Sequence, residues 1–228
     1  MKILSIDTSS KLCGIAILEN ENIIKEISRD NGLTHSETLM PIIKETLENL
    51  NLTLNDIDLI VCDKGPGSFT GIRIGVATAK AFSDSLNIQT IGISSLDALA
   101  YNVKENGVIC SLIDAKNDNV YVSVFENING NYILRRNCTC ENISDLLDEL
   151  KLVEYSITFV GDGAVNYKSI ITSALPNKCN FIDTNDLSAY NLGLAGLSHY
   201  KNEQFDDVTP LYLRKPQAER MLDNKKGT

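Results

Sequence analysis

Two patterns of hydrophobic positions alternate along the chain and predict alternating strands and helices. Short apolar runs bounded by Gly, Asn, Asp or Ser are typical of strands, and apolar residues three or four positions apart are typical of helices. In the first half these patterns predict strands at 2–6, 14–18, 22–28, 58–62 and 89–93, with helices at 34–50, 70–86 and 94–103. In the second half they predict strands at 108–113, 120–125, 132–136, 157–160 and 180–183, with helices at 143–152, 166–173 and 187–202.

The helix at 34–50 has a recognisable start. Its apolar residues would share one face, and Thr34 with Glu37 forms the capping-box pattern. Pro41 lacks a backbone donor, which predicts either a kink or a helix that begins later than the cap.

The two halves follow the same order of elements, which predicts an internal repeat. Asp7 and Asp114 each end a strand, and the chain enters the next strand about seven residues later. Any two units with this order of strands and helices would look alike, so that alternative stays open. Two such halves facing each other across a cleft describe the class of actin, hexokinase and Hsp70, in which the Asp-ended hairpins hold the phosphates and metal of ATP.

Composition narrows the function classes. The chain has 228 residues, of which 43% are hydrophobic and 22% charged, and its net charge is −9. An acidic chain is poorly suited to grip nucleic acid by itself, so any RNA would be held by a more basic partner. Met1 leads directly into a strand and no apolar run approaches 18 residues, which predicts neither secretion nor a membrane span.

The six cysteines predict buried thiols in a reducing cytoplasm. Cys13, Cys62 and Cys110 lie in apolar strands. Cys138 and Cys140 have the wrong spacing for a common zinc site and no His nearby. His35 lacks a second His three or four residues along its helix, so no metal site is expected there either.

Three short segments are candidates for vestigial nucleotide binding. Asp7, Thr8 and Ser9 form a polar turn after the first strand, which is either a phosphate-binding hairpin or an ordinary turn. Asp114 opens the corresponding second turn, which has no glycine and so makes close approach to a phosphate less favourable. The segment Gly161-Asp162-Gly163 would lie near a base or ribose, or would form only a tight strand-to-helix turn.

The most informative segment runs from 63 to 80. A glycine-rich loop, Gly65-Pro66-Gly67-Ser68, joins a strand to a helix, and the exposed amides of such a helix start suit an anion or another backbone. The helix then carries Gly71, Gly75 and Ala79 at every fourth position. Each helical glycine costs about 1 kcal/mol relative to alanine, so the smooth stripe calls for a close neighbour, either this chain's own sheet or another subunit.

Together these residues resemble the TsaB family, also called YeaZ, over nearly the whole chain. The matching segments are Ile6-Asp7-Thr8-Ser9, Cys13-Gly-Ile-Ala16, His35-Ser-Glu37, the block Gly65–Gly75, Ser94-Ser-Leu96, Asp114-Ala115, Gly161–Gly163 and Pro210–Arg214. The chain departs from the family at the second hairpin, which has Lys116 and Asn117 after Asp114-Ala115, and this weakens the case for nucleotide binding there.

The resemblance implies a two-lobed, actin-like, ribonuclease-H-like ATPase fold of the α/β class, with a mixed βββαβα-type sheet in each lobe. The first lobe would span 1–104, a reduced second lobe 105–214, and a polar tail 215–228. The family implies a non-catalytic subunit that supports threonylcarbamoyl transfer to the tRNA adenosine next to the anticodon. Its implied partners are the catalytic paralogue TsaD and the ATPase TsaE, with tRNA reached only through the complex and a homodimer when the partner is absent.

The resemblance also implies where partners and cofactors would bind. The chain itself would need no cofactor, and ATP or ADP would lie at the partner interface. The interface would come from the helices 34–50 and 70–86. Its expected residues are His35, Leu39, Ile42, Gly71, Ile72, Gly75, Thr78, Ala79 and Phe82.

Three other functions compete with this one. An ATP-dependent phosphotransferase of the same fold class would need both Asp7 and Asp114 on a metal–nucleotide, and the second turn has no glycine. A metallopeptidase-like protein would need more than the single His35 on its helix. Nothing in the sequence favours a chaperone-like binding module.

Overall fold

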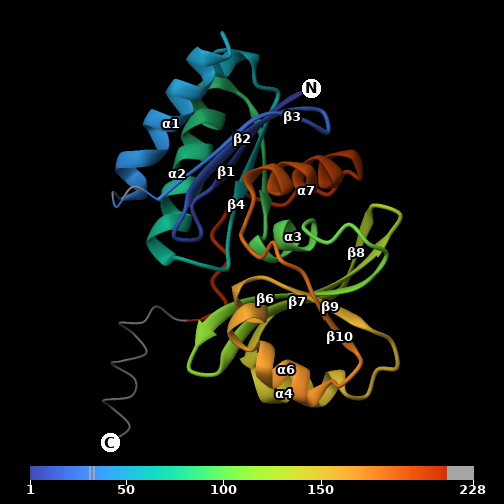
Figure 1. Cartoon of the computed structure of the whole chain (residues 1–228). Helices are drawn as coiled ribbons and strands as arrows, with labels where there is room; N and C mark the ends of the chain where they lie inside the picture. Colours follow the sequence, from blue (N-terminus) through green and yellow to red (C-terminus); the bar gives the residue numbers. More distant parts are fainter. Residues whose placement is uncertain (31, 33, 215–228) are drawn as a thin grey trace, which may run out of the picture.

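Two five-stranded mixed sheets form the framework of the chain (Figure 1). The computed structural model describes residues 1–30, 32 and 34–214. The expected polar tail at 215–228 lies outside the described residues. Within them, no helix combines the length and apolar character that crossing a membrane would require.

The first sheet has the order β3-β2-β1-β4-β5. β2 pairs antiparallel with both β1 and β3, while β4 and β5 run parallel to β1. β1 and β4 are buried along almost their whole length, as their unbroken apolar sequences predict. Its strands are β1 (Lys2–Asp7), β2 (Cys13–Glu19), β3 (Asn22–Arg29), β4 (Leu59–Asp63) and β5 (Gln89–Ile93).

The second sheet repeats this topology, with the order β10-β9-β6-β7-β8. β7 again pairs antiparallel with its two neighbours, β6 and β8, and β9 and β10 again run parallel to β6. The predicted internal repeat and the actin-like fold class are therefore confirmed. The strands are β6 (Gly107–Lys116), β7 (Asn119–Ile128), β8 (Asn131–Asn142), β9 (Ile157–Val160) and β10 (Cys179–Phe181).

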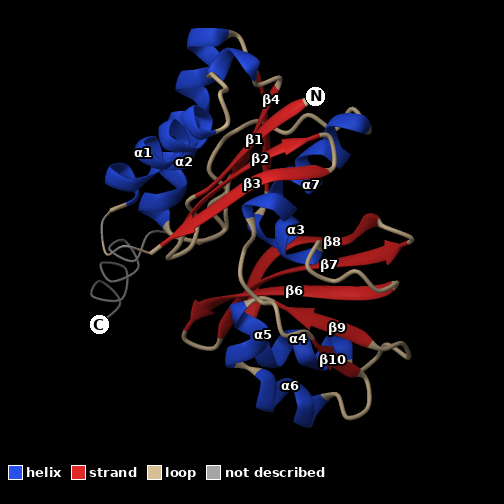
Figure 2. Cartoon of the chain, turned by 45° about the horizontal axis from the view of Figure 1, so that its top comes forward, coloured by secondary structure: helices blue, strands red, loops and turns tan. Residues whose placement is uncertain are grey.

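Helices cover both faces of the first sheet (Figure 2). α1 (His35–Asn49) and α2 (Phe69–Leu86) pack on one face, where their apolar residues join those of β1, β2 and β4 in one core. α3 (Ser95–Ala100) and α7 (Ala189–Lys201) lie on the other side of the sheet. A short 3₁₀ turn, η1 (Leu54–Asp56), precedes β4.

The start of α1 is fixed by its cap. Both the backbone N–H and the Oγ1 of Thr34 donate to Glu37 Oε2, over 3.0 and 2.6 Å. The helix therefore begins at His35, as the cap predicts, and Pro41 lies inside it on the exposed side. A later start, one of the two predicted effects of Pro41, does not occur.

The helices of the second lobe gather on one face of its sheet. α4 (Ile143–Leu150), α5 (Asp162–Asn166) and α6 (Lys168–Ala174) enclose a core with β6, β7 and β9. The opposite face of β6 and β7 packs against α3, so α3 connects the two lobes. α5 is the one helix here that the sequence pattern did not predict.

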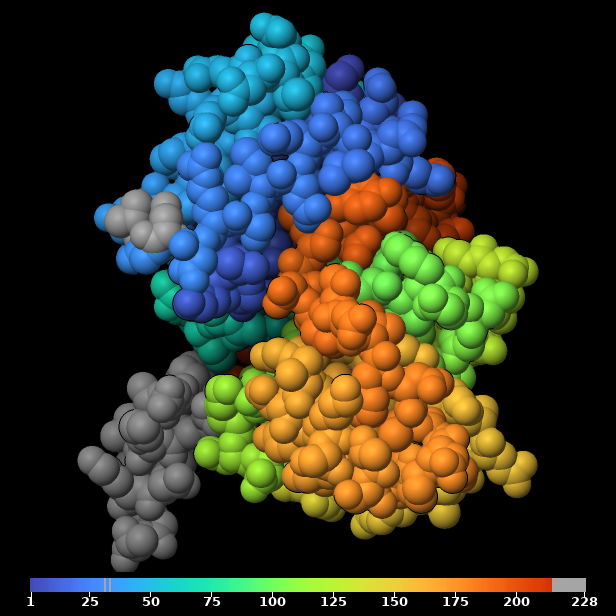
Figure 3. Space-filling view, in the orientation of Figure 1, coloured from blue at the N-terminus to red at the C-terminus, as the bar shows by residue number. Residues whose placement is uncertain are grey.

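α7 follows the second sheet in sequence but covers the first. Its apolar residues pack on β1, β2 and β4, and the chain that leads into it, orange in Figure 3, crosses from the lower lobe to the upper one. Ser5 Oγ donates to Ala189 O over 2.5 Å. Glu26 Oε1 accepts hydrogen bonds from Ser188 Oγ and Tyr190 N and so fixes the start of the helix.

The segment after α7 joins the two lobes. Leu211 N donates to Lys64 O over 2.7 Å, at the end of the first sheet. Arg214 Nη1 donates to Ala115 O over 2.5 Å, at the second hairpin. Between them, Tyr212 stacks on Phe69 with ring centroids 4.4 Å apart and accepts a hydrogen bond from Arg73 Nε.

Candidate functional site

The carboxyl ends of β1 and β4 place two aspartates side by side. These strands run parallel, with Ile6 opposite Cys62, so Asp7 and Asp63 follow at the same edge of the sheet. Asp7 is 2% exposed and Asp63 is 1% exposed. Two adjacent buried carboxyl groups can both ionise only at a large cost in free energy, so this edge is the most unusual electrostatic feature of the first lobe.

Hydrogen bonds from three segments meet at this pair. Ser9 Oγ lies 2.8 Å from both Asp7 Oδ1 and Asp63 Oδ2, and Ser9 N donates to Asp7 Oδ1 over 2.8 Å. Gly65 N donates to Asp63 Oδ1 over 2.6 Å, and Ser95 Oγ lies 2.8 Å from the same oxygen. The turn after β1, the glycine-rich loop and the start of α3 are thus tied to one pair of carboxyl groups.

The pair holds a shared proton to a higher pH than a free carboxyl group does. Burial raises the pKa of Asp63 well above its usual range, and the charge of Asp7 raises it further. Burial also raises the pKa of Asp7, but hydrogen bonds from Ser9 and Asp63 and the charge of His35 oppose that shift. Of the two groups, Asp63 therefore has the more strongly raised pKa.

The glycine-rich loop sits directly on the turn after β1. Ser68 N donates to Ser9 O over 2.6 Å, and a Cβ atom at Gly67 would overlap that same carbonyl oxygen. Gly65, next to the cis bond to Pro66, has φ of 97°, a conformation that favours glycine. The sequence predicted that the start of α2 would contact either an anion or another backbone segment. In the structure it contacts the backbone of the turn after β1.

The stripe Gly71, Gly75 and Ala79 faces inward. A Cβ atom at Gly71 would overlap Thr8 O, and one at Gly75 would lie 2.5 Å from Thr8 Oγ1. Thr8 Oγ1 in turn donates to Gly71 O over 2.8 Å. The close neighbour that the stripe requires is therefore this chain's own first turn and sheet.

Most of the residues expected at a partner interface are buried within this chain. Seven of the nine lie in the core of the first lobe, because the apolar side of each helix packs on the sheet: Leu39, Ile42, Gly71, Ile72, Gly75, Ala79 and Phe82. His35 and Thr78 are partly exposed. Any partner surface on α1 and α2 must use the opposite side of these helices.

His35 connects α1 to the first turn. Its Nε2 lies 2.9 Å from Ser10 O, and its ring edge lies close to Gly71. This contact orients the imidazole ring toward the first turn. In the part of the chain that the structure describes, no three His, Cys, Asp or Glu side chains come together in a way that would hold a metal ion.

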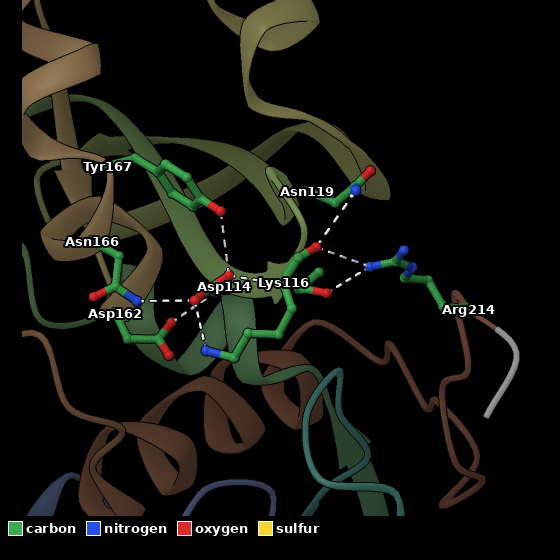
Figure 4. A network of polar contacts seen from close by, with 8 residues as sticks. Asp114, Lys116, Asn119, Asp162, Asn166, Tyr167 and Arg214 are labelled. Atoms are coloured by element: carbon green, nitrogen blue, oxygen red, sulfur yellow. Dashed lines mark hydrogen bonds and ion pairs between the residues drawn. The ribbon is translucent and has the colours of Figure 1, made fainter. Parts of the chain in front are cut away.

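Asp114 is the centre of a second polar network, in the other lobe (Figure 4). Lys116 Nζ lies 2.7 Å from Asp114 Oδ2, and Asn166 Nδ2 donates to the same oxygen over 3.0 Å. Asp114 N donates to Asp162 Oδ1 over 2.9 Å. Burial acts to raise the pKa of Asp114, but the hydrogen bonds and charge of Lys116 outweigh it, and the pKa is lowered.

The second turn has an unusual backbone for a segment without glycine. The backbone φ angles of Lys116, Asn117 and Asp118 are 64°, 55° and 58°. Three successive residues other than glycine therefore adopt the left-handed backbone conformation. Arg214 Nη1 covers the carbonyl of Ala115 nearby. Side chains and the C-terminal segment of this chain thus contact Asp114 and the start of the turn that follows it.

Gly161 and Gly163 are required by packing on β6. Gly161 has φ of 103°, and a Cβ atom there would overlap Leu112 O. A Cβ atom at Gly163 would lie 2.9 Å from Leu112 Cβ. Of the two alternatives for this segment, the tight strand-to-helix turn accounts for both glycines.

The structure therefore forms two separate groups from the predicted nucleotide-site residues. Asp7, Thr8 and Ser9 join the glycine-rich loop on the first sheet, and Asp114 joins Asp162 on the second. Sequence reasoning missed Asp63 as a site residue. The signal was available, because Asp63 ends a strand that runs parallel to the one ended by Asp7.

Known proteins resemble this chain along most of its length. A family model described as TsaD, tRNA N6-adenosine threonylcarbamoyltransferase, matches residues 27–221. The tRNA threonylcarbamoyladenosine biosynthesis protein TsaB of Bacillus subtilis is 34% identical, with 96% of each chain covered. The protein of the same name in Haemophilus influenzae is 28% identical, with 94% of each covered.

Solved structures share the fold at lower identity. YeaZ from Pseudomonas aeruginosa superposes with a TM-score of 0.74 at 23% identity, covering 93% of this chain and 99% of that one. The activator of 2-hydroxyisocaproyl-CoA dehydratase from Clostridium difficile was solved with bound ADPNP. It superposes with a TM-score of 0.51 at 13% identity, covering 90% of this chain and 97% of that one.

Replacing Gly71 by alanine tests the close contact at the first turn. The new methyl group would collide with the backbone oxygen of Thr8, which cannot move independently of β1. We expect Gly71→Ala to lower the free energy of unfolding by about 3 kcal/mol, measured by urea denaturation. The control is Gly14→Ala, whose Cβ would lie at an ordinary 3.6 Å from Ala189 Cβ. Equal stability of the two variants would contradict the inward orientation of the stripe.

The shared proton predicts a pH dependence of stability. Since the pKa of Asp63 is higher in the folded than in the unfolded chain, its contribution is complete at low pH. Stability is then lost as the pH rises from about 4, where unfolded Asp ionises, toward the higher folded pKa. Asp63→Asn keeps a neutral hydrogen-bonding group at the pair.

We expect Asp63→Asn to flatten this slope and to increase stability at pH 8, where each unit of pKa difference corresponds to about 1.4 kcal/mol. Urea denaturation at several pH values measures both effects. Asp84→Asn, on the exposed side of α2, should leave the slope unchanged. An unchanged slope in Asp63→Asn would show that the pair does not share a proton.

Proposed function

The chain belongs to the TsaB family, and on that premise we propose that it is a non-catalytic subunit in the biosynthesis of threonylcarbamoyladenosine in tRNA. In this proposal it docks on TsaD, the paralogue that performs the transfer. Docking would activate TsaD by binding its active conformation more tightly than the inactive one.

The filled first turn is the observation that supports a non-catalytic role. Thr8 is fully buried and Ser9 is 3% exposed, because the glycine-rich loop and α2 cover them. A phosphate-binding hairpin must offer its amides to the ligand, whereas here Ser9 N donates to Asp7. We infer that neither nucleotide nor substrate reaches Asp7, and that ATP or ADP, where required, binds at the junction with the partner.

The outward side of α1 and α2 is the proposed docking surface. Ala77 and Ala81 stand four residues apart on the exposed side of α2, and Met40 of α1 is 47% exposed. Small exposed side chains at helical spacing allow another helix to approach closely, and an exposed methionine adapts to different neighbours. These residues replace the buried stripe that the sequence suggested.

The other expected partners follow from the same surface and from charge. With a net charge of −9, the chain would reach tRNA only through the complex. The ATPase TsaE would join the assembled pair, and a second copy of this chain would occupy the α1–α2 surface when TsaD is absent. The cytoplasm is the compartment where this chemistry would occur.

A charge on the smooth outer face of α2 should disrupt docking. We expect Ala81→Glu to weaken the complex with TsaD at least about tenfold and to abolish TsaD-dependent threonylcarbamoylation of tRNA, because a carboxylate would be buried in the interface. Titration calorimetry measures the affinity, and circular dichroism checks the fold.

The matched control is Ser173→Glu, also on an exposed helical position but in the second lobe. It should bind TsaD as the unmodified chain does. Full activity and affinity in Ala81→Glu, or equal losses in both variants, would contradict docking through α2.

The isolated chain should bind ATP only weakly. Because the first turn is filled and Asp114 is engaged by Lys116, we expect a Kd above about 1 mM for Mg-ATP by calorimetry. Micromolar binding with turnover would favour the competing function, an ATP-dependent phosphotransferase.

A further inference from the structure

A cavity of about 630 Å³ lies between the two lobes, away from the docking surface proposed above. Asp97 of α3, Tyr132 and Leu134 of β8, and His199 near the end of α7 all line it, and Asp206 follows from the next segment. In Figure 1, α7 lies above α3, and the β7–β8 hairpin lies to the right of α3. Neither α1 nor α2 contributes to its lining, so this inference does not depend on the proposed function.

The charge around the cavity is negative. Two carboxylates, Asp97 and Asp206, line it, and none of the described lining residues is Lys or Arg. Lys64 lies beside it and pairs with Asp206, with Nζ 2.8 Å from Oδ2. Carboxyl groups thus outnumber lysine at the cavity by two to one, which disfavours a phosphate and favours a single cation. Burial raises the pKa of Asp97, and a bound cation would oppose that shift.

Polar groups at the inner end of the cavity have unused capacity for hydrogen bonds. His199 Nδ1 is buried without a hydrogen-bond partner among the described residues. Asp97 Oδ2 accepts a hydrogen bond from Ser94 Oγ over 2.8 Å, which orients the carboxylate at the start of α3. A buried polar atom without a partner costs free energy. In the tautomer that carries its proton on Nε2, this nitrogen is an acceptor that a donor from a ligand would satisfy.

Apolar and aromatic side chains line the cavity beside its polar groups. Leu134 is 48% exposed and Phe205 is 53% exposed, and they come from different lobes. The ring of Phe125 also lines the cavity. Tyr132 does so too, and its ring is held in place by stacking on Tyr101 with centroids 3.9 Å apart. Aromatic faces attract organic cations, and exposed apolar side chains cover aliphatic stems.

We propose that this cavity binds an organic cation: an ammonium or guanidinium group carried on an aliphatic stem. The charged head binds between Asp97 and His199, and the stem lies between Leu134 and Phe205. Such a group is supplied either by a free small molecule or by a Lys or Arg side chain of another protein.

Titration calorimetry on the full chain tests this proposal with three probes. Butylguanidine carries the guanidinium and the stem, butylurea is its neutral analogue, and the peptide acetyl-Gly-Arg-Gly-amide presents the same group as a side chain. We expect butylguanidine to bind and butylurea to bind at least about tenfold more weakly. If only butylguanidine binds, the ligand is a free cation. If the peptide binds as tightly or more tightly, it is a side chain.

A matched pair of variants locates the binding. Gln204 lines the cavity and is exposed, so substitutions there should fold normally. Gln204→Lys places a competing cation in the cavity and should abolish butylguanidine binding, while Gln204→Met, of similar length and uncharged, should keep it. Asp97→Asn should weaken binding at least about tenfold, and Asp145→Asn, in the first turn of α4, should not.

Two results would overturn the proposal. One is that neither butylguanidine nor the peptide binds to the unmodified chain. The other is that both bind equally well to Gln204→Lys and Gln204→Met, which would place the site elsewhere.

Discussion

Backbone contact between the turn after β1 and the start of α2 is the constraint on which the first lobe depends. Gly67 and Gly71 allow this approach because any side chain would overlap the carbonyl oxygens of Ser9 and Thr8. The contact fixes the position of α2 on the sheet, and the carboxyl pair beneath it ties in α3 through Ser95. The conformations of the loop, the helix and the buried acids are therefore not independent of one another.

The two lobes share a topology but not a chemistry. Both sheets have the same strand order, and each has an aspartate at or near the end of its first strand. In the first lobe the carboxylate of Asp7 is buried beneath the glycine-rich loop. In the second lobe the carboxylate of Asp114 pairs with Lys116, whose side chain is 74% exposed. The same framework thus supports a closed, rigid turn in one lobe and a polar, solvent-facing turn in the other, with a negatively charged cavity between them.

The sequence predicted most of the fold because local patterns determine most of it. Strand and helix periods located nearly every element, and the Thr34–Glu37 cap located the start of α1. The spacing of Gly71 and Gly75 predicted a close neighbour but could not say which one, since spacing defines a face and not what lies against it. The cavity at Asp97 and His199 could not be predicted, because its lining comes from distant segments that only the tertiary structure brings together.

The position of α7 has a consequence for how this protein is made. Ser5 and Ala189 are in direct contact although 184 positions separate them, and α7 covers apolar residues of β1, β2 and β4. On the ribosome, the first lobe emerges long before the helix that completes it. One face of its sheet must therefore stay uncovered until almost the whole chain has been synthesised, a period in which nascent chains are most exposed to aggregation and to chaperones.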